Sequence, residues 1–464
     1  MKTGTTYPKF VNDCFKKRIE NYFVVIHPSK PSWVMLNRFG MKVAELLNGE
    51  NSVPDIARII SAEFEVEKDV VEKDVKKFVV SLQRADMIEA VADKESTAEK
   101  PFFSSLFFYV TKKCNLHCRH CCFPEKQNEY AVELAEDDLL NFLDDFYSCG
   151  GERIALTGGE PLLRKDLIKS VLKRSLNREV RILTNGTLID DEFAELIGNY
   201  NVSVQVSIDG SNEAIHDSIR GRGAFKAAIK GIEALKRNGM CQRTNLNTTL
   251  MSKNVTDYKN IIRLAHDLEV PFVRFIPLRQ IGSACASWSE ISCGLLQDEC
   301  EEFFDYVNQH AREEFPGMKI TNGISGFVLD PKKFDKRGNW CSIGKELAVD
   351  TNGDIFPCVI MMQKEFCLGN IRTTTVNDLE KSPLLEKLVT AMSERKDHNS
   401  KCQECMWKNF CQCGCMAMAV DRFGSIWEPD EFCSYRKKLY DEALIKIAQG
   451  KTSANIMGGE TECT

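Results

Sequence analysis

Short apolar segments alternate with longer segments of helical periodicity from residue 103 onward. The apolar segments are rich in β-branched and aromatic side chains, which predicts strands at 106–111, 153–157, 180–184, 202–208, 246–250 and 272–276. Helices are predicted between them, among others at 134–147, 165–174, 225–237 and 256–268. Six strand–helix units in series predict an α/β fold with a parallel sheet, either open or closed into a partial (β/α)6 TIM-like barrel. In such sheets the chemistry lies at the carboxyl ends of the strands.

The residues before this pattern form a separate small unit. Segments 22–26 and 33–36 predict two strands, and segments 56–64 and 71–82 repeat apolar residues at helix spacing. This combination predicts a small α+β, winged-helix-like domain over residues 1–92. Residues 93–101 are polar and charged throughout, which predicts a linker.

Composition narrows the class of protein. The chain has 464 residues, and its 61 Lys and Arg against 67 Asp and Glu give a net charge of −6. It has no long basic run and no apolar stretch long enough to span a bilayer, so neither a nucleic acid nor a membrane is expected as a partner. The first residues do not form a secretory signal, which predicts a cytoplasmic protein. Thiols stay reduced there, so the 20 Cys indicate metal or iron-sulfur ligation rather than disulfides.

Three cysteines directly follow the first predicted strand of the barrel. Cys114, Cys118 and Cys121 have the spacing Cys-x3-Cys-x2-Cys. Three thiolates on one loop suit a four-iron cluster in which one iron has no protein ligand, and such an iron is free to bind a substrate or cofactor. The alternative is a structural zinc site with Cys122 as the fourth ligand.

With this triplet the chain resembles the radical S-adenosylmethionine (SAM) enzymes. The resemblance extends to a Gly-Gly-Glu-Pro segment at the end of the second predicted strand, formed by Gly158, Gly159, Glu160 and Pro161. It implies that the open iron chelates the amino and carboxylate groups of SAM and that this segment meets the amino group. Glycines let the backbone approach a ligand closely, and a carboxylate accepts a charge-assisted hydrogen bond from an ammonium group.

The resemblance also implies cofactor contacts at the next two strand ends. Thr184 and Asn185 end the third predicted strand, and Ser207 and Asp209 lie at the end of the fourth, near the cofactor ribose and carboxylate. Arg220 matches a position whose guanidinium pairs with the cofactor carboxylate. For each of these residues a turn or helix cap is an equally good interpretation.

The chemistry that the resemblance implies is reductive. The reduced cluster passes one electron to SAM, and the resulting 5′-deoxyadenosyl radical abstracts a hydrogen atom from the substrate. The cofactor carries the difficult step, so no catalytic side chain is predicted. Reduced flavodoxin or ferredoxin is the expected electron donor.

Seven cysteines near the C-terminus resemble the pattern of the SPASM domain, which usually holds two auxiliary four-iron clusters. The resemblance implies one fully ligated cluster, held by Cys402, Cys405, Cys411 and Cys433, and a second one, held by Cys341, Cys358 and Cys415. The protein would then bind three [4Fe–4S] clusters. One auxiliary iron stays open unless Cys413 or Cys367 fills it. Taken alone, Cys402 and Cys405 would also suit a zinc knuckle.

The N-terminal unit resembles the PqqD-like leader-recognition domain of ribosomal peptide maturases. Such domains bind the leader of a precursor peptide as an added strand. The predicted domains are therefore 1–92 for leader recognition, 93–101 as linker, 102–320 as radical SAM barrel, 321–449 as SPASM domain and 450–464 as mobile tail. Within the SPASM segment, Asn352 and Gly353 predict a hairpin with a two-residue turn.

The open auxiliary iron suits a substrate thiolate, which predicts thioether crosslinking of a precursor peptide, as in enzymes of the sactipeptide and ranthipeptide type. Sulfatase maturation to formylglycine is an alternative, although those enzymes carry an Asp where this chain has Val359, and an extra Cys where residues 342–347 have none. Carbon–carbon crosslinking and epimerisation are also open. A non-enzymatic alternative is an iron-sulfur or zinc peptide-binding adaptor.

Overall fold

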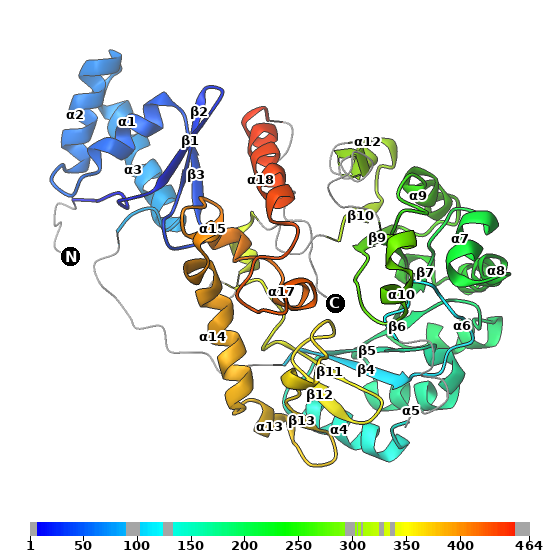
Figure 1. The fold of residues 1–464 in the computed structure, drawn as a ribbon. Coiled ribbons are helices and arrows are strands. Elements are labelled where there is room, and N and C mark those ends of the chain that lie inside the picture. Colours follow the sequence, from blue (N-terminus) through cyan, green and yellow to red (C-terminus); the bar gives the residue numbers. More distant parts are fainter. Residues whose placement is uncertain are drawn as a thin grey trace.

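The computed structural model describes residues 7–89, 103–123, 133–292, 302–303, 305–307, 310–323, 329–334 and 339–450. The predicted linker at 93–101 and the predicted tail from residue 451 lie outside these ranges. Figure 1 shows a small N-terminal unit, a large α/β sheet and a C-terminal part made mainly of helices. No helix within the described ranges is long and apolar enough to cross a bilayer.

The N-terminal unit is a three-stranded antiparallel sheet covered by helices on one face. Strand β2 lies between β1 and β3. Segment β1, with the sequence Phe-Lys-Lys-Arg-Ile, was not predicted because its central charged residues hide the strand pattern. The elements are β1 (Phe15–Ile19), β2 (Tyr22–Ile26), β3 (Trp33–Leu36), α1 (Arg38–Leu46), α2 (Val53–Phe64) and α3 (Lys68–Arg84).

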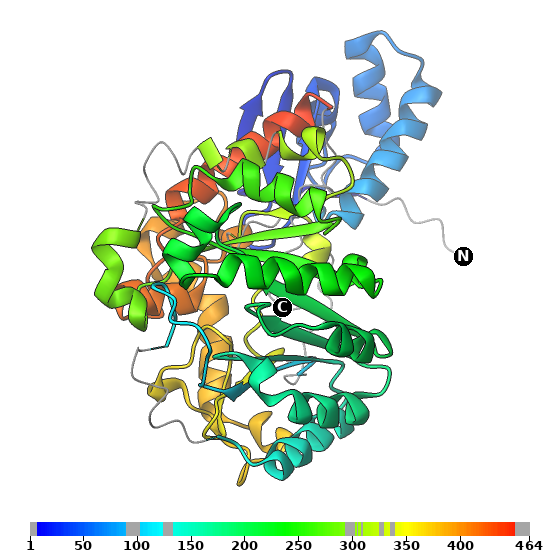
Figure 2. The ribbon, with the colours of Figure 1, turned by 90° about the vertical axis from the view of Figure 1, so that its right-hand side faces the viewer.

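The other face of this small sheet packs on the C-terminal helices. Its side chains form one buried apolar cluster with residues of α16 (Lys408–Cys411) and α18 (Cys433–Ala448). Figures 1 and 2 both show the sheet beside α18. Polar contacts join the same surfaces, since Asn409 Nδ2 donates to the His27 carbonyl over 3.3 Å and Lys17 pairs with Asp441 at 2.7 Å. The main members of the cluster are Ile19, Val24, Ile26, Trp407, Phe410, Tyr440 and Leu444.

The central sheet confirms the predicted α/β fold. All six predicted strands are present, with bounds within two residues of the prediction, and each pairs in parallel with the next. Among the described residues the strand order is β10-β9-β8-β7-β6-β5-β4-β11-β12-β13. The parallel strands are β4 (Ser105–Thr111), β5 (Arg153–Gly158), β6 (Glu179–Thr184), β7 (Val202–Ser207), β8 (Thr244–Leu250), β9 (Phe272–Pro277) and β10 (Lys319–Thr321).

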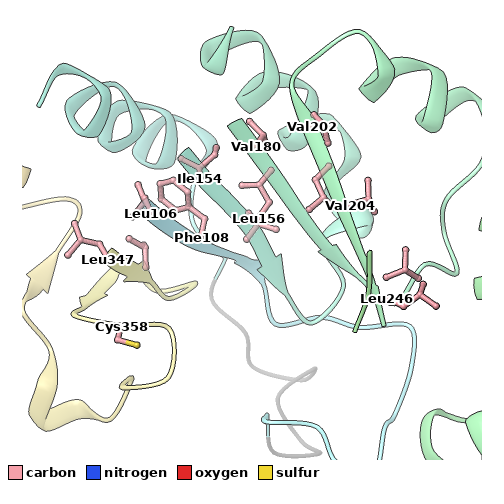
Figure 3. Close-up of a cluster of buried hydrophobic side chains, with 14 of the residues drawn as sticks. Leu106, Phe108, Ile154, Leu156, Val180, Val202, Val204, Leu246, Leu347 and Cys358 are labelled. Atoms are coloured by element: carbon pink, nitrogen blue, oxygen red, sulfur yellow. The ribbon is translucent and has the colours of Figure 1, made fainter. Parts of the chain in front are cut away.

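Helices cover the outer face of this sheet. Leu106, Phe108, Ile154, Leu156 and Val204 all point to that face and belong to the largest buried cluster (Figure 3). The covering and connecting helices are α4 (Glu136–Ser148), η2 (Pro161–Arg164), α5 (Lys165–Ser175), α6 (Asp191–Gly198), α7 (Glu213–Arg220), α8 (Ala224–Arg237), η3 (Cys241–Arg243), α9 (Tyr258–Asp267), α10 (Ser283–Ile291) and α12 (Ala311–Glu314).

The cysteine-rich segment extends the barrel sheet. Strand β11 (Glu346–Val349) pairs in parallel with β4, and β12 (Asp354–Phe356) and β13 (Gly369–Asn370) continue the sheet in antiparallel fashion. The predicted hairpin is confirmed, but the two-residue turn is wrong. Asp350 N donates to Asp354 O, which leaves a three-residue loop. Gly353 closes this loop with φ 92°, the left-handed conformation that such loops need at their last position.

The remaining C-terminal elements form a compact helical layer. The buried guanidinium of Arg395 holds the loops of this layer together, because it donates to the carbonyls of Gly414 and Glu428 over 2.8 and 2.7 Å. The elements are η4 (Pro331–Lys333), η5 (Lys364–Phe366), α13 (Val376–Leu379), α14 (Pro383–His398), α15 (Ser400–Gln403), α16, α17 (Met416–Phe423) and α18.

Candidate functional site

The loop that carries the cysteine triplet leaves the carboxyl end of β4, as predicted. The end of β5 binds this loop through its backbone: Gly159 N donates to Thr111 O over 2.7 Å, and Glu160 N to Lys113 O over 2.8 Å. A Cβ atom on Gly158 or Gly159 would lie 2.2 Å from a carbonyl oxygen of the loop. The two glycines thus allow the two strand ends to approach each other closely. This structural role does not depend on a bound ligand.

The three thiols of the triplet lie near one another and near nitrogen donors. Cys114 Sγ is 3.5 Å from Leu116 N and 3.9 Å from Asn185 Nδ2, and Cys118 Sγ is 3.9 Å from Arg220 Nη1. Burial raises the pKa of Cys118 to about 12, while Arg220 acts in the opposite direction. Thiolates at this loop therefore require added positive charge, which a cluster iron supplies. N–H groups directed at sulfur are also a usual feature around iron-sulfur clusters.

Within the described ranges, no three His, Cys, Asp or Glu side chains are grouped so that one metal ion would fit among them. This applies to a zinc ion at the triplet as it does at the other thiol groups. Cys122 lies beside Cys121 and also interacts electrostatically with Cys118.

Glu160 joins the ends of β5 and β6. Its carboxylate is fully buried, with Oε1 accepting from Thr184 Oγ1 at 2.7 Å and Oε2 from Asn185 N at 2.8 Å. Pro161 begins η2 directly after it. The structure thus brings Glu160, Thr184 and Asn185 together beside Cys114. A carboxylate has about four acceptor positions, so Glu160 keeps capacity for a further donor such as an ammonium group.

Asp209 and Arg220 form a buried ion pair behind the triplet. Arg220 Nε donates to Asp209 Oδ2 over 2.6 Å, and Thr249 N donates to Oδ1 over 2.8 Å. Burial by itself raises the pKa of Asp209, but the positive charge of Arg220 holds that pKa below its usual value. Ser207 ends β7 next to Asn247 of β8, on the same side of the sheet. The predicted cofactor residues thus cluster at the carboxyl ends of the neighbouring strands β5, β6 and β7, with Arg220 at the end of α7.

A second group of thiols lies where β12 leaves the edge of the barrel sheet. Cys341, Cys358 and Cys415 interact electrostatically with one another, and burial raises the pKa of each. Figure 3 shows Cys358 beside β11, next to the parallel strands. Sequence analysis did not identify Glu346 of β11 as part of this group. Its carboxyl contacts the Cys358 thiol, and burial raises its pKa to about 7.

A third group of thiols lines a small hollow in the helical layer. Arg436, which the sequence analysis also missed, donates from Nη1 to Cys411 Sγ over 3.1 Å and forms a buried ion pair with Asp430. Trp407 and Tyr440 close the hollow toward the N-terminal unit. The hollow is lined by all four cysteines predicted for the fully ligated cluster and by Cys413.

Cys413 and Cys367, the two cysteines that could complete the second group, each have another partner. Cys413 contacts Cys402 in the hollow of the third group. Cys367 donates to the Gly369 carbonyl over 3.3 Å and packs in the apolar cluster of Phe107 and Phe356. Neither placement puts a further thiol beside Cys341, Cys358 and Cys415.

Comparisons with known proteins agree with this arrangement. The family profile described as the radical SAM superfamily matches residues 108–265, the profile of coenzyme PQQ synthesis protein D matches 22–88, and the SPASM iron-sulfur cluster-binding domain matches 341–406. The chain is 28% identical over 354 residues to Fe-coproporphyrin III synthase of Methanosarcina barkeri, an alignment that covers 71% of the chain and 87% of the relative.

Two further relatives are similar to the chain. The subtilosin biosynthesis protein AlbA of Bacillus subtilis is 25% identical over 347 residues, covering 73% of the chain and 72% of AlbA. The crystal structure of SuiB from Streptococcus suis with S-adenosylmethionine superposes with a TM-score of 0.58 at 14% identity, covering 92% of the chain and 99% of SuiB. The fold is therefore shared over nearly the whole of SuiB.

Domains of these kinds bind SAM with a [4Fe–4S] cluster in the barrel and auxiliary iron-sulfur clusters in the SPASM part. The thiol groups and buried polar side chains described above fit that requirement. The chain therefore carries a radical SAM domain, with a PqqD domain before it and a SPASM domain after it.

Proposed function

We propose that this enzyme modifies a ribosomally made precursor peptide whose leader is held by the N-terminal domain. The observation that carries the proposal is the docking of that domain: its sheet packs directly on the helices that surround the third thiol group. A peptide held there is bound beside the cysteine-rich layer. AlbA and SuiB, which takes a precursor peptide named SuiA, support a peptide substrate.

We propose that the leader binds at the β3 edge of the small sheet. Strand β1 lies beside α18, whereas β3 forms the other edge of the small sheet. An extended peptide that adds to a sheet edge gains main-chain hydrogen bonds, and pockets for alternate side chains give specificity. Val70 and Val80 of α3 are exposed apolar side chains on the same domain and supply apolar contact surface.

The cluster and cofactor ligands are part of the proposal. Cys114, Cys118 and Cys121 hold the SAM-binding cluster, and the predicted residues at the ends of β5, β6 and β7, together with Arg220, bind the cofactor. Cys402, Cys405, Cys411 and Cys433 hold one auxiliary cluster, and Cys341, Cys358 and Cys415 the other. We also propose the domain limits 1–92, 102–320 and 321–449, a cytoplasmic location, and reduced flavodoxin or ferredoxin as electron donor.

The reaction we propose is thioether formation between a cysteine sulfur and a carbon of the same peptide. Three thiolates on a four-iron cluster leave one auxiliary iron for a further ligand, and a substrate thiolate is a natural one. When bound, the reduced barrel cluster and SAM supply the hydrogen abstraction. Overall, one C–H and one S–H bond are lost and one C–S bond forms, while SAM is converted to 5′-deoxyadenosine and methionine and one proton is released. The auxiliary clusters return the second electron.

Anaerobic turnover tests the proposal. The protein is reconstituted with iron and sulfide, reduced with dithionite and given SAM together with a Cys-rich precursor encoded beside its gene. We expect release of 5′-deoxyadenosine and a peptide that has lost two hydrogen atoms per crosslink, located by tandem mass spectrometry. If SAM is cleaved but the mass of the peptide stays unchanged, the peptide crosslinking proposal is wrong.

A further inference from the structure

Glu346 is a buried carboxylate with no counter-charge in contact. Its side chain is on β11, 2% exposed, and the residue pairs in register with Ser105 at the start of β4. Oε1 accepts from Val359 N over 3.2 Å. Arg274 and Arg153 influence it electrostatically, but within the described ranges no Lys, Arg or His nitrogen lies at ion-pair distance from the carboxyl.

Such a group is costly unless something compensates its charge. Buried carboxylates in proteins are paired with a cation, coordinate a metal or remain protonated, because the interior solvates an isolated charge poorly. The Cys358 thiol is close to this carboxyl, because Cys358 directly precedes Val359, whose N–H group donates to Glu346 Oε1. Cys358 interacts in turn with Cys341 and Cys415.

The chain connectivity keeps Glu346 at this thiol group. Glu346 N donates to Ser342 O over 2.9 Å, next to Cys341, and Ser342 Oγ lies 3.9 Å from Cys358 Sγ. The backbone of β11 is fixed by its ladder with β4. Glu346 is thus held between two of the three cysteines whose cluster lacks a fourth protein ligand, whereas Cys367 donates to the Gly369 carbonyl and Cys413 contacts Cys402.

We infer that Glu346 is the fourth protein ligand of the auxiliary cluster that Cys341, Cys358 and Cys415 hold. The inference rests on the proposed cluster assignment. Sulfur-bridged iron favours thiolate over carboxylate, so Glu346 is a ligand that a substrate thiolate displaces. The auxiliary iron is therefore closed in the resting enzyme and becomes available to sulfur when the peptide arrives.

Spectroscopy of the auxiliary clusters tests this assignment without relying on activity. In a background where Cys114, Cys118 and Cys121 are all Ala, the protein keeps only its auxiliary clusters. Glu346→Gln and Glu346→Cys are compared in this background by iron content, by Mössbauer spectra of ⁵⁷Fe-loaded protein and by electron paramagnetic resonance of the reduced state. Glu179→Gln is the control, because Glu179 is a barrel carboxylate that already has a partner, Arg181, at 3.2 Å.

We expect the parent to show one oxygen-ligated iron, and Glu346→Cys to show only sulfur-ligated iron at the same iron content. 2-Mercaptoethanol is then added as the thiol probe. The concentration of 2-mercaptoethanol that changes the electron paramagnetic resonance spectrum should be at least tenfold lower for Glu346→Gln than for the parent. The spectrum of Glu346→Cys should not change. Glu179→Gln should behave as the parent. The inference would be wrong if the parent and both Glu346 variants gave the same spectra. It would also be wrong if Glu346→Cys lost the cluster.

A further variant separates this inference from the cluster assignment itself. Cys341→Ala in the same background should lower the iron content. If Cys341→Ala keeps all its iron, the proposed cluster position is wrong. If Cys341→Ala loses iron while the Glu346 variants match the parent, only the role of Glu346 is wrong.

Discussion

Arg220 donates from Nε to Asp209 Oδ2 over 2.6 Å, and its Nη1 lies 3.9 Å from Cys118 Sγ. One guanidinium therefore connects the end of β7 to the cysteine triplet. Asp209 is completely buried and Arg220 is 8% exposed, so the pair is shielded from water. The positive charge compensates both the carboxylate and a neighbouring thiolate, which explains why two residues far apart in sequence belong to one site.

We predict that Arg220→Met lowers the stability of the barrel by about 3 to 5 kcal/mol, because it leaves the Asp209 carboxylate buried without its counter-charge. Adding Asp209→Asn should restore a large part of that loss. Anaerobic thermal unfolding measures both effects. The control is Arg237→Met, whose partner Asp191 lies 2.9 Å away on the surface, and it should change stability by about 1 kcal/mol or less. Equal effects of the two Arg variants would contradict the role of burial.

We predict that Cys114→Ala, Cys118→Ala and Cys121→Ala each abolish SAM cleavage, because each removes a ligand that the cluster needs. The measurement is release of 5′-deoxyadenosine by the reduced, iron-loaded protein. Cys241→Ala is the control, since that thiol lies between α8 and α9 and contacts only the Leu268 carbonyl, at 3.8 Å, among the described polar groups. Normal release from any of the three variants would remove that cysteine from the ligand set.

We predict that Cys341→Ala retains SAM cleavage but loses crosslinked peptide, because the auxiliary cluster acts after hydrogen abstraction. Both products are quantified in the same reaction, 5′-deoxyadenosine by chromatography and the peptide by mass. Cys367→Ala is the matched control, because this half-buried thiol packs in an apolar cluster and donates to the Gly369 carbonyl. An unchanged yield of crosslinked peptide from Cys341→Ala would contradict the auxiliary role.

We predict that protonation of His216 lowers the stability of the barrel as the pH falls from 6.5 toward 4. Burial and the charge of Arg220 lower its pKa to about 4, and its Nδ1 accepts from Asp209 N over 3.1 Å. The pKa of His216 is thus lower in the folded state than in the unfolded state, where it is near 6.5. Its contribution to the free energy of unfolding is therefore fully present above pH 6.5. Below that pH it is lost at up to about 1.4 kcal/mol per pH unit. His216→Gln should remove this part of the acid sensitivity between pH 7.5 and 5.5 in thermal unfolding, whereas the exposed His266→Gln should not.

We predict that deletion of residues 1–92 has two effects. It should weaken binding of the precursor leader most strongly, as measured by titration with the leader peptide. It should also lower the iron content of the auxiliary clusters, because it uncovers Trp407 and Tyr440, which close the hollow of the third thiol group. Val80→Glu, on the exposed face of α3, is the comparison. It should weaken leader binding and leave the iron content unchanged, and unaltered leader affinity in both variants would refute leader recognition by this domain.

The sequence by itself determined the elements whose signal is local. Strands β4 to β9 were predictable because each is a short apolar run between helical segments, and the cysteine triplet and the Gly-Gly-Glu-Pro segment follow their strands directly. Strand β1 was missed because charged residues interrupt its pattern. The two-residue turn was wrong because the pairing of Asp350 with Asp354, which sets the loop length, is a property of the strand register.

Only the tertiary structure decided the contacts between distant segments. The parallel pairing of Glu346 with Ser105 joins residues 241 positions apart, and no local pattern marks such a pairing. The same holds for the packing of the N-terminal sheet on α18 and for Arg436 beside Cys411. The residue types at a metal site are readable from sequence because ligand chemistry restricts them. The packing of the layers decides which charged side chain lies beside which thiol. Burial matters here because a charge acts more strongly on its neighbours in the protein interior than in water.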